Sequence, residues 1–169
     1  ALVSPQDATL TASEEISIRI RNYGTNAQSN FEVTYSVNGG QQVTEVFERT
    51  ITGESSAEFT FEQTADLSEI GETYTLTLAT NLENDSNNDN DALEVEVKNL
   101  PPNDIGITSI DSPFTDENLT STEEVTVTVS NLGGEAQQNF PLSYQIGNNA
   151  PVIETYSEQL EVGEDAVYT

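Results

Sequence analysis

The stretch ISIRIRNYGTNAQSNFEVTYSV, residues 16–37, decides the fold, because its apolar side chains recur at every second position. Two runs carry this alternation: Ile16, Ile18 and Ile20, then Phe31, Val33, Tyr35 and Val37. Successive side chains of a β-strand point to opposite faces, so a period of two indicates strands that are buried on one face. The segments 73–81 and 91–98 repeat the pattern, and no long window has a helical period. The sequence therefore predicts an all-β chain with little or no helix.

The same stretch recurs later in the chain. Residues 119–149, LTSTEEVTVTVSNLGGEAQQNFPLSYQIGNN, align without a gap with residues 10–40 at an offset of 109 positions. Identical pairs include Glu14/Glu123, Glu15/Glu124, Asn22/Asn131, Gly24/Gly133, Asn30/Asn139, Phe31/Phe140 and Tyr35/Tyr144. A repeat of about 100 residues has the length of one β-sandwich domain. We therefore expect two tandem immunoglobulin-like Greek-key β-sandwiches.

The alignment also predicts the domain boundaries. The first sandwich is expected over residues 1–98, a proline-rich linker over 99–103, and the second sandwich over 104–169. In the first repeat the predicted strands are 14–22, 30–38, 42–51, 56–62, 73–81 and 91–98, after a short edge strand near 1–10. The alignment ends at Thr169, so the second sandwich is expected to be truncated at its C-terminal end and to lack its last two strands. The chain is accordingly expected to be a piece of a longer protein.

The composition excludes several classes of function. With 30 acidic and four basic residues, the formal net charge of −26 repels nucleic acid and anionic lipid surfaces. The sequence has no His and no Cys, which excludes a Ser-His-Asp triad, a cysteine nucleophile and the usual zinc sites, so an enzyme is not expected. No apolar run approaches the roughly 18–20 residues that span a bilayer. The predicted partners therefore include no nucleic acid, and no direct membrane insertion is expected.

One loop is rich in oxygen ligands. The stretch NDSNNDND, residues 84–91, carries carboxylate or amide side chains at alternate positions: Asp85, Asn87, Asp89 and Asp91. Alternate oxygen ligands on a curling loop are typical of calcium sites. The glycine and the bidentate glutamate of an EF-hand are absent, because Asn90 and Glu96 stand at those positions. The alternative is a hairpin loop held by Asx turns. No cofactor other than calcium at this loop is expected.

Several repeated side chains allow more than one interpretation. The acidic pair 14–15 could serve acid–base chemistry, but a charged strand entry that resists edge pairing is the preferred interpretation. Phe31 and Tyr35 alternate on one strand, which favours a packed face over an exposed platform for sugars. Asn22 and Gly24 indicate a turn, with the Asn side chain bonding its own backbone and the glycine taking positive φ.

The segments NYGTNAQSNFEVTYSVNGGQQVTEVF (22–47) and NLGGEAQQNFPLSYQIGNNAPVIETY (131–156) resemble a known repeat class. They are similar to the N-x-G-x-x-x-x-x-N-F-x-[VL]-x-Y-x-[VI] core of tandem Ig-like repeats of the CARDB (cell-adhesion-related) type. Such repeats occur in very large surface proteins of Bacteroidota, including gliding-motility adhesins. The resemblance implies an extracellular, cell-surface location and a stalk or adhesin context, and it brings no catalytic residues.

These observations together predict a non-catalytic repeat segment of a long bacterial cell-surface adhesin. The segment would act as a spacer or stalk and contribute to adhesion or gliding. Its expected partners are other repeats of the same long chain, together with surface polysaccharide or another cell-surface protein. The alternative is an accessory Ig-like or carbohydrate-binding module of a secreted enzyme.

Overall fold

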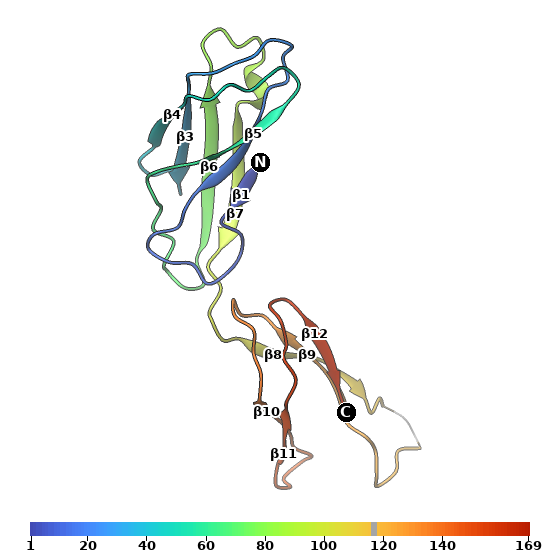
Figure 1. Cartoon of the computed structure of the whole chain (residues 1–169). Coiled ribbons are helices and arrows are strands. Elements are labelled where there is room, and N and C mark those ends of the chain that lie inside the picture. Colours follow the sequence, from blue (N-terminus) through green and yellow to red (C-terminus); the bar gives the residue numbers. More distant parts are fainter. Residues whose placement is uncertain (116–117) are drawn as a thin grey trace. The chain divides into compact units, whose positions relative to one another are not determined.

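The structure is a computed structural model that describes residues 1–115 and 118–169 (Figure 1). It confirms the all-β fold. The strands are β1 (Leu2–Ser4), β2 (Ser17–Arg21), β3 (Phe31–Val37), β4 (Val43–Phe47), β5 (Ser56–Thr60), β6 (Thr73–Asn81), β7 (Ala92–Lys98), β8 (Ile105–Ser112), β9 (Thr126–Asn131), β10 (Phe140–Tyr144), β11 (Val152–Tyr156) and β12 (Asp165–Tyr168). The described residues contain no α-helix, and η1 (Asn88–Asn90) is a single 3₁₀ turn. The chain divides into two compact units, Ala1–Asn99 and Leu100–Thr169.

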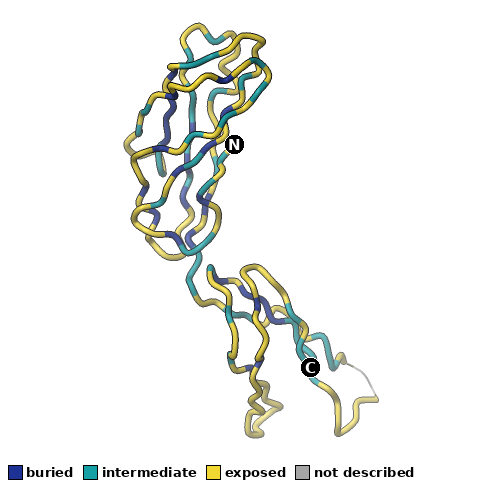
Figure 2. The backbone as a smooth tube through the Cα atoms, in the orientation of Figure 1, coloured by how far each residue is buried: buried dark blue, intermediate teal, exposed yellow. Residues whose placement is uncertain are grey.

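The first unit is a β-sandwich. One sheet has the order β1-β2-β5 and the other the order β4-β3-β6-β7, and every strand pairing is antiparallel. This is the strand order of an immunoglobulin-type Greek-key sandwich, as the alternation and repeat length predict. The inward side chains of both sheets form one core, and buried positions alternate with exposed ones along the strands (Figure 2).

The strand β6 lies at the centre of this core. It pairs with β3 on one side and β7 on the other. Its Tyr74, Leu76 and Leu78 side chains are buried against the facing sheet. Burying a leucine side chain completely contributes about 1.5–3 kcal/mol. This one strand therefore supplies a large part of the apolar contact between the sheets.

The second unit repeats the same plan with five strands, in the sheets β12-β9-β8 and β10-β11. The pairing registers coincide at the offset of 109. Ile18 opposes Phe59 just as Val127 opposes Tyr168, and Phe31 opposes Phe47 just as Phe140 opposes Tyr156. Positive φ also recurs at matched positions: Asn30/Asn139, Asn38/Gly147 and Glu54/Gly163. Within the described residues, the second unit has no counterpart of β6 or β7.

The stretch 99–103, predicted to be a linker, is divided between the two units. The fully buried Asn99 bonds Leu10 and Leu67 of the first unit through its side chain. The Pro101 carbonyl accepts a hydrogen bond from the Gly134 N–H of the second unit at 2.8 Å. Asn99 is therefore bonded into the first unit and Pro101 into the second.

Candidate functional site

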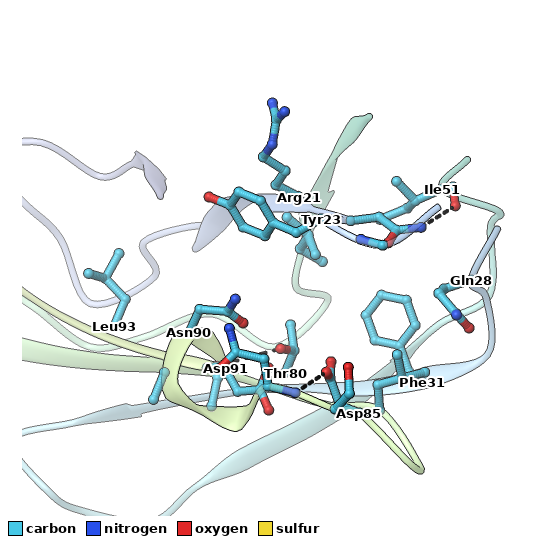
Figure 3. Close-up of a pocket in the computed structure, with 18 of the residues that line it drawn as sticks. Arg21, Tyr23, Gln28, Phe31, Ile51, Thr80, Asp85, Asn90, Asp91 and Leu93 are labelled. Atoms are coloured by element: carbon cyan, nitrogen blue, oxygen red, sulfur yellow. Dashed lines mark hydrogen bonds between the residues drawn. The ribbon is translucent and has the colours of Figure 1, made fainter. Parts of the chain in front are cut away.

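A cleft of about 730 Å³ opens in the first unit, at the end of the sandwich where the oxygen-rich loop lies (Figure 3). One wall consists of the end of β2 and the connection 22–28. The other consists of the loop 84–91 with the adjoining ends of β6 and β7. The cleft thus brings the connection 22–28 and the loop 84–91 together, although they lie about 60 residues apart in the chain.

The loop 84–91 is held by its own hydrogen bonds. The Asp85 carboxylate accepts from the Asn87 N–H at 2.9 Å, and the Asn87 side chain accepts from the Asp89 N–H at 3.3 Å. These are two successive Asx turns, and the second one caps the start of the η1 turn. The turns proposed as the alternative to a calcium loop are therefore present. Local side-chain chemistry explains how this loop keeps its shape.

Three of the four candidate calcium ligands border the cleft. Asp85, Asn87 and Asp91 line the cleft, whereas Asp89 is not among the lining residues. Within the part of the chain that the structure describes, no three Asp, Glu, His or Cys side chains are grouped as metal ligands. Calcium binding remains a prediction from the oxygen pattern. Calorimetric titration tests it, since a saturable heat should be lost in Asp85→Ala.

The Asp91 carboxyl at the cleft responds to its surroundings. Partial burial raises the pKa of Asp91, and the negative charge of Asp85 raises it further. A hydrogen bond from the Thr80 hydroxyl acts in the opposite direction. The cleft therefore favours the neutral form of Asp91 more than water does, and a carboxylic acid in that form can donate as well as accept hydrogen bonds.

The opposite wall carries Arg21 and Tyr23. The Arg21 guanidinium lies 5.1 Å from the centre of the Tyr23 ring, and Tyr23 is 67% exposed. In Figure 3 these two residues lie across the cleft from Asp85 and Asp91. Figure 3 shows the Arg21 side chain extending away from Asp85 and Asp91, so the cleft offers an aromatic ring with acidic and amide groups. This combination suits hydrogen bonding to a polyhydroxylated ligand. The sequence alone did not single out Tyr23. The only signal was that the aligned position of the second repeat holds Leu132 instead.

The repeated glutamates have a structural role. The Glu14 carboxylate accepts from the Thr11 N–H at 2.6 Å and from the Thr11 hydroxyl at 2.7 Å. Glu123 makes the same two bonds to Thr120 at the same distances. These bonds from Thr120 lower the pKa of Glu123. The sequence analysis missed this turn, although the Thr-x-x-Glu spacing in both repeats was its signal.

The repeated asparagines and glycines confirm one expectation and correct another. The Asn22 side chain bonds nearby backbone, accepting from the Gly24 N–H at 3.0 Å and donating to the Ile51 carbonyl. Neither Gly24 nor Gly133 has positive φ, so that part of the prediction is wrong. A Cβ on Gly133 would lie 2.7 Å from the Asp104 nitrogen, so close backbone approach requires the glycine there.

The aromatic pairs differ between the units. Phe31 and Tyr35 are buried, which confirms the packed face in the first unit. The Tyr35 hydroxyl donates to the Gln63 carbonyl at 2.9 Å, and burial, with the nearby Glu45 charge, raises the Tyr35 pKa. Tyr144, the counterpart of Tyr35, is 40% exposed. An identical residue in an identical strand pattern therefore has a different environment.

Comparisons with known proteins add no relative. No protein-family model matches the chain, and the search of curated proteins found no match. Among the residues that the structure describes, no helix has the length and apolar character needed to cross a membrane.

Proposed function

We propose that this chain is a non-catalytic repeat segment of a bacterial cell-surface adhesin. The observation that carries the proposal is the duplication itself, in which one sandwich plan recurs at an offset of 109 with the same strand registers. Repeating a self-contained module adds reach without new chemistry, which is the property that a spacer needs. The resemblance of both repeats to CARDB-type segments supports the same assignment.

The surface chemistry is consistent with this role. A net charge of −26 keeps neighbouring copies of an acidic module apart, because like charges repel at close range. The Glu14 and Glu123 carboxylates each hold a local turn, and the Asn22 and Asn131 side chains each bond backbone of a distant segment of their own unit. The repeated side chains thus preserve the fold, and contact with a partner falls to positions that differ between repeats.

Tyr23 is such a position, and we assign adhesive contact to the cleft that it borders. The exposed ring and the loop amides fit the apolar faces and hydroxyl groups of a surface polysaccharide. The same cleft favours, as a second candidate, the carbohydrate-binding module of a secreted enzyme. The two functions differ in which polysaccharide is bound: that of a cell surface, or the substrate of a hydrolase.

The test compares the intact chain with Tyr23→Ala on beads. We expect the chain to retain beads on surfaces coated with bacterial surface polysaccharide, and Tyr23→Ala to reduce retention about tenfold, the scale of one lost aromatic contact. Leu132→Ala is the matched control, because Leu132 occupies the same repeat position in the second unit. Equal retention by both variants would contradict the cleft as the contact site. Retention only on plant or storage polysaccharides would favour the accessory module.

A further inference from the structure

The outer face of the sheet β1-β2-β5 carries basic side chains in an otherwise acidic chain. Arg19 and Arg21 point outward from β2, because Ile18 and Ile20, which alternate with them, are buried in the core. Both arginines are exposed, and Figure 3 shows the Arg21 side chain extending away from the opposite wall of the cleft. All five residues of β2 pair with β5. The strand pairing that shapes this face is therefore complete.

Arg49, the third arginine, reaches the same strands from the connection that follows β4. It donates a hydrogen bond to the Glu58 carbonyl, while the Arg19 Nη2 atom lies 2.6 Å from the Glu58 carboxylate. Glu58 thus contacts two guanidinium groups that come from distant parts of the sequence. Beside it, Arg21 lies opposite Ser56 of β5. All arginines of the chain therefore gather around β2 and β5.

Aromatic rings hold two of these guanidinium groups. The Arg21 guanidinium carbon lies 5.1 Å from the centre of the Tyr23 ring, and that of Arg49 lies 5.2 Å from the centre of the Phe47 ring. A guanidinium on a ring face keeps its in-plane N–H groups available for an anion. Arg19 is held by Glu58, and both side chains of this pair are more than half exposed. Water screens such a pair, so an incoming carboxylate displaces it at small cost.

The local charge of this face is opposite to that of the chain. Among the paired residues of β2 and β5, Glu58 is the only acidic residue, against two arginines. The fourth basic residue, Lys98, lies on β7 of the other sheet, and strand alternation places Glu94 and Glu96 on its face. In a chain with a net charge of −26, the basic side chains thus form a cluster at β2 and β5 only.

The second repeat folds without these arginines. The positions that match them hold Thr128, Ser130 and Glu158. Nevertheless β9 pairs with β12 in the register in which β2 pairs with β5. The sandwich plan therefore does not require arginine at these positions, and a role in binding accounts for the cluster.

Three anionic partners differ in how well they fit this face. A second copy of the chain would bring its own net charge of −26, and the paired residues of β2 and β5 offer no exposed apolar anchor for a protein interface. Duplex nucleic acid carries a charge about every 1.7 Å, so most of its phosphates would face acidic surface. An acidic polysaccharide spaces its carboxylates a sugar apart, and at about 0.15 M salt the Debye length of about 8 Å screens the more distant acidic groups. The charge spacing therefore favours the polysaccharide.

We propose that the outer face of β2 and β5 binds an acidic polysaccharide, with Arg19 and Arg21 pairing with its carboxylates and Arg49 at the edge of the site. The planar guanidinium group matches a carboxylate through two parallel hydrogen bonds. The Ser17 and Thr60 hydroxyls, whose oxygens lie 2.7 Å apart on the same face, bond sugar hydroxyl groups. The site adjoins the cleft but recognises charge, so it stands without the cleft as a contact site.

Calorimetric titration of the full 169-residue chain with polygalacturonate oligomers tests the proposal, without divalent ions and at about 0.15 M salt. The methyl ester of the same oligomers is the uncharged control ligand. We expect saturable binding of the acid form only, weakened about fivefold by Arg19→Gln or by Arg21→Gln, the scale of one exposed charge contact. Lys98→Gln removes the same charge on the other sheet and should leave binding unchanged.

No saturable binding by a chain that unfolds cooperatively would overturn the proposal, as would equal binding of the acid and the ester. Equal weakening by Lys98→Gln and Arg21→Gln would show a response to net charge without a site. Equally tight binding of a DNA duplex would assign the face to nucleic acid, and self-association abolished by Arg21→Gln would assign it to a second copy. Binding of the ester that Tyr23→Ala weakens would place the sugar contact in the cleft alone, so the proposed function would survive this failure.

Discussion

At the scale of single residues, fully buried asparagines fix the ends of the strands. Asn99 bonds the Leu10 N–H at 2.9 Å, the Leu10 carbonyl at 3.2 Å and the Leu67 carbonyl at 2.8 Å. Asn131 does the same for its own turn, with bonds to the Glu135 and Leu160 carbonyls. A buried polar group is tolerated only where its partners are present, so these amides hold loops in defined places.

We expect Asn99→Ala to destabilise the first unit by about 2–4 kcal/mol, because three buried backbone groups lose their partner. Chemical denaturation of the intact chain measures the change. Asn26→Ala, at an exposed side chain, is the control and should change stability by less than about 0.5 kcal/mol. Equal effects of the two substitutions would show that the Asn99 amide is not a structural anchor.

The pKa of Asp91 is a second prediction at this scale. Desolvation raises it first and the Asp85 charge second, so Asp85→Asn should lower the Asp91 pKa but leave it above its ordinary value. Because the Asp91 pKa is higher in the folded state than in the unfolded state, its contribution to stability is fully present when the pH is below the unfolded-state pKa. That contribution is lost as the pH rises through the folded-state pKa. Carboxyl NMR titration of both proteins measures the shift. An unchanged Asp91 pKa would show that Asp85 does not act on it.

At the scale of elements, β6 distinguishes the two units. The sequence pattern of β10 is that of β3, yet among the described residues β10 is paired on one side only. A central strand gains hydrogen bonds and apolar cover on both sides, so its opening requires wider disruption. The difference between the units is thus a difference in neighbours along the sheet.

Amide exchange should reveal this difference. We expect the Ser143 amide to exchange on the order of tenfold or more faster than the matching Thr34 amide, because only Thr34 is directed toward a paired strand. Hydrogen exchange followed by NMR on the intact chain provides the measurement. Val129 and Ile20, which lie on paired central strands in both units, serve as the internal reference. Similar rates at Thr34 and Ser143 would contradict an open edge.

At the scale of the whole molecule, charge is the dominant property. The chain carries a net charge of −26, and its one salt bridge among the described residues, Arg19 with Glu58, is exposed. Exposed ion pairs contribute little, so repulsion among the acidic groups is hardly offset by pairing. The folded state holds these charges closer together than the unfolded chain does.

Salt should therefore stabilise the fold. Raising the salt concentration from about 0.01 M to about 0.1 M shortens the Debye length from about 30 Å to about 10 Å. We expect the midpoint of thermal unfolding to rise by about 2–4 °C, the shift that about 1 kcal/mol produces in a chain of this size. Magnesium chloride at the same ionic strength should act equally. A fall in the midpoint would contradict self-repulsion, and an excess specific to calcium would indicate binding at the loop 84–91.

The sequence by itself determined the strands, the fold class and the repeat. Alternation of Ile16, Ile18 and Ile20 is a local property, and the offset of 109 aligns residues without knowledge of their contacts. The Asx turns at Asp85 were also accessible as an alternative, because an Asx turn involves neighbouring residues only. These features could be predicted since each depends on a short segment.

The tertiary structure alone decided the environment of each face. Tyr35 and Tyr144 are identical and occupy the same repeat position, yet one is buried and the other lines an open groove. Gly133 is required by the approach of Asp104, a residue far from it in the chain, and not by its own φ. The cleft joins Tyr23 to Asp91 only because the end of β2 and the start of β7 border the same opening. Burial, close approach and clefts depend on which distant strands become neighbours, and a periodic pattern does not specify that.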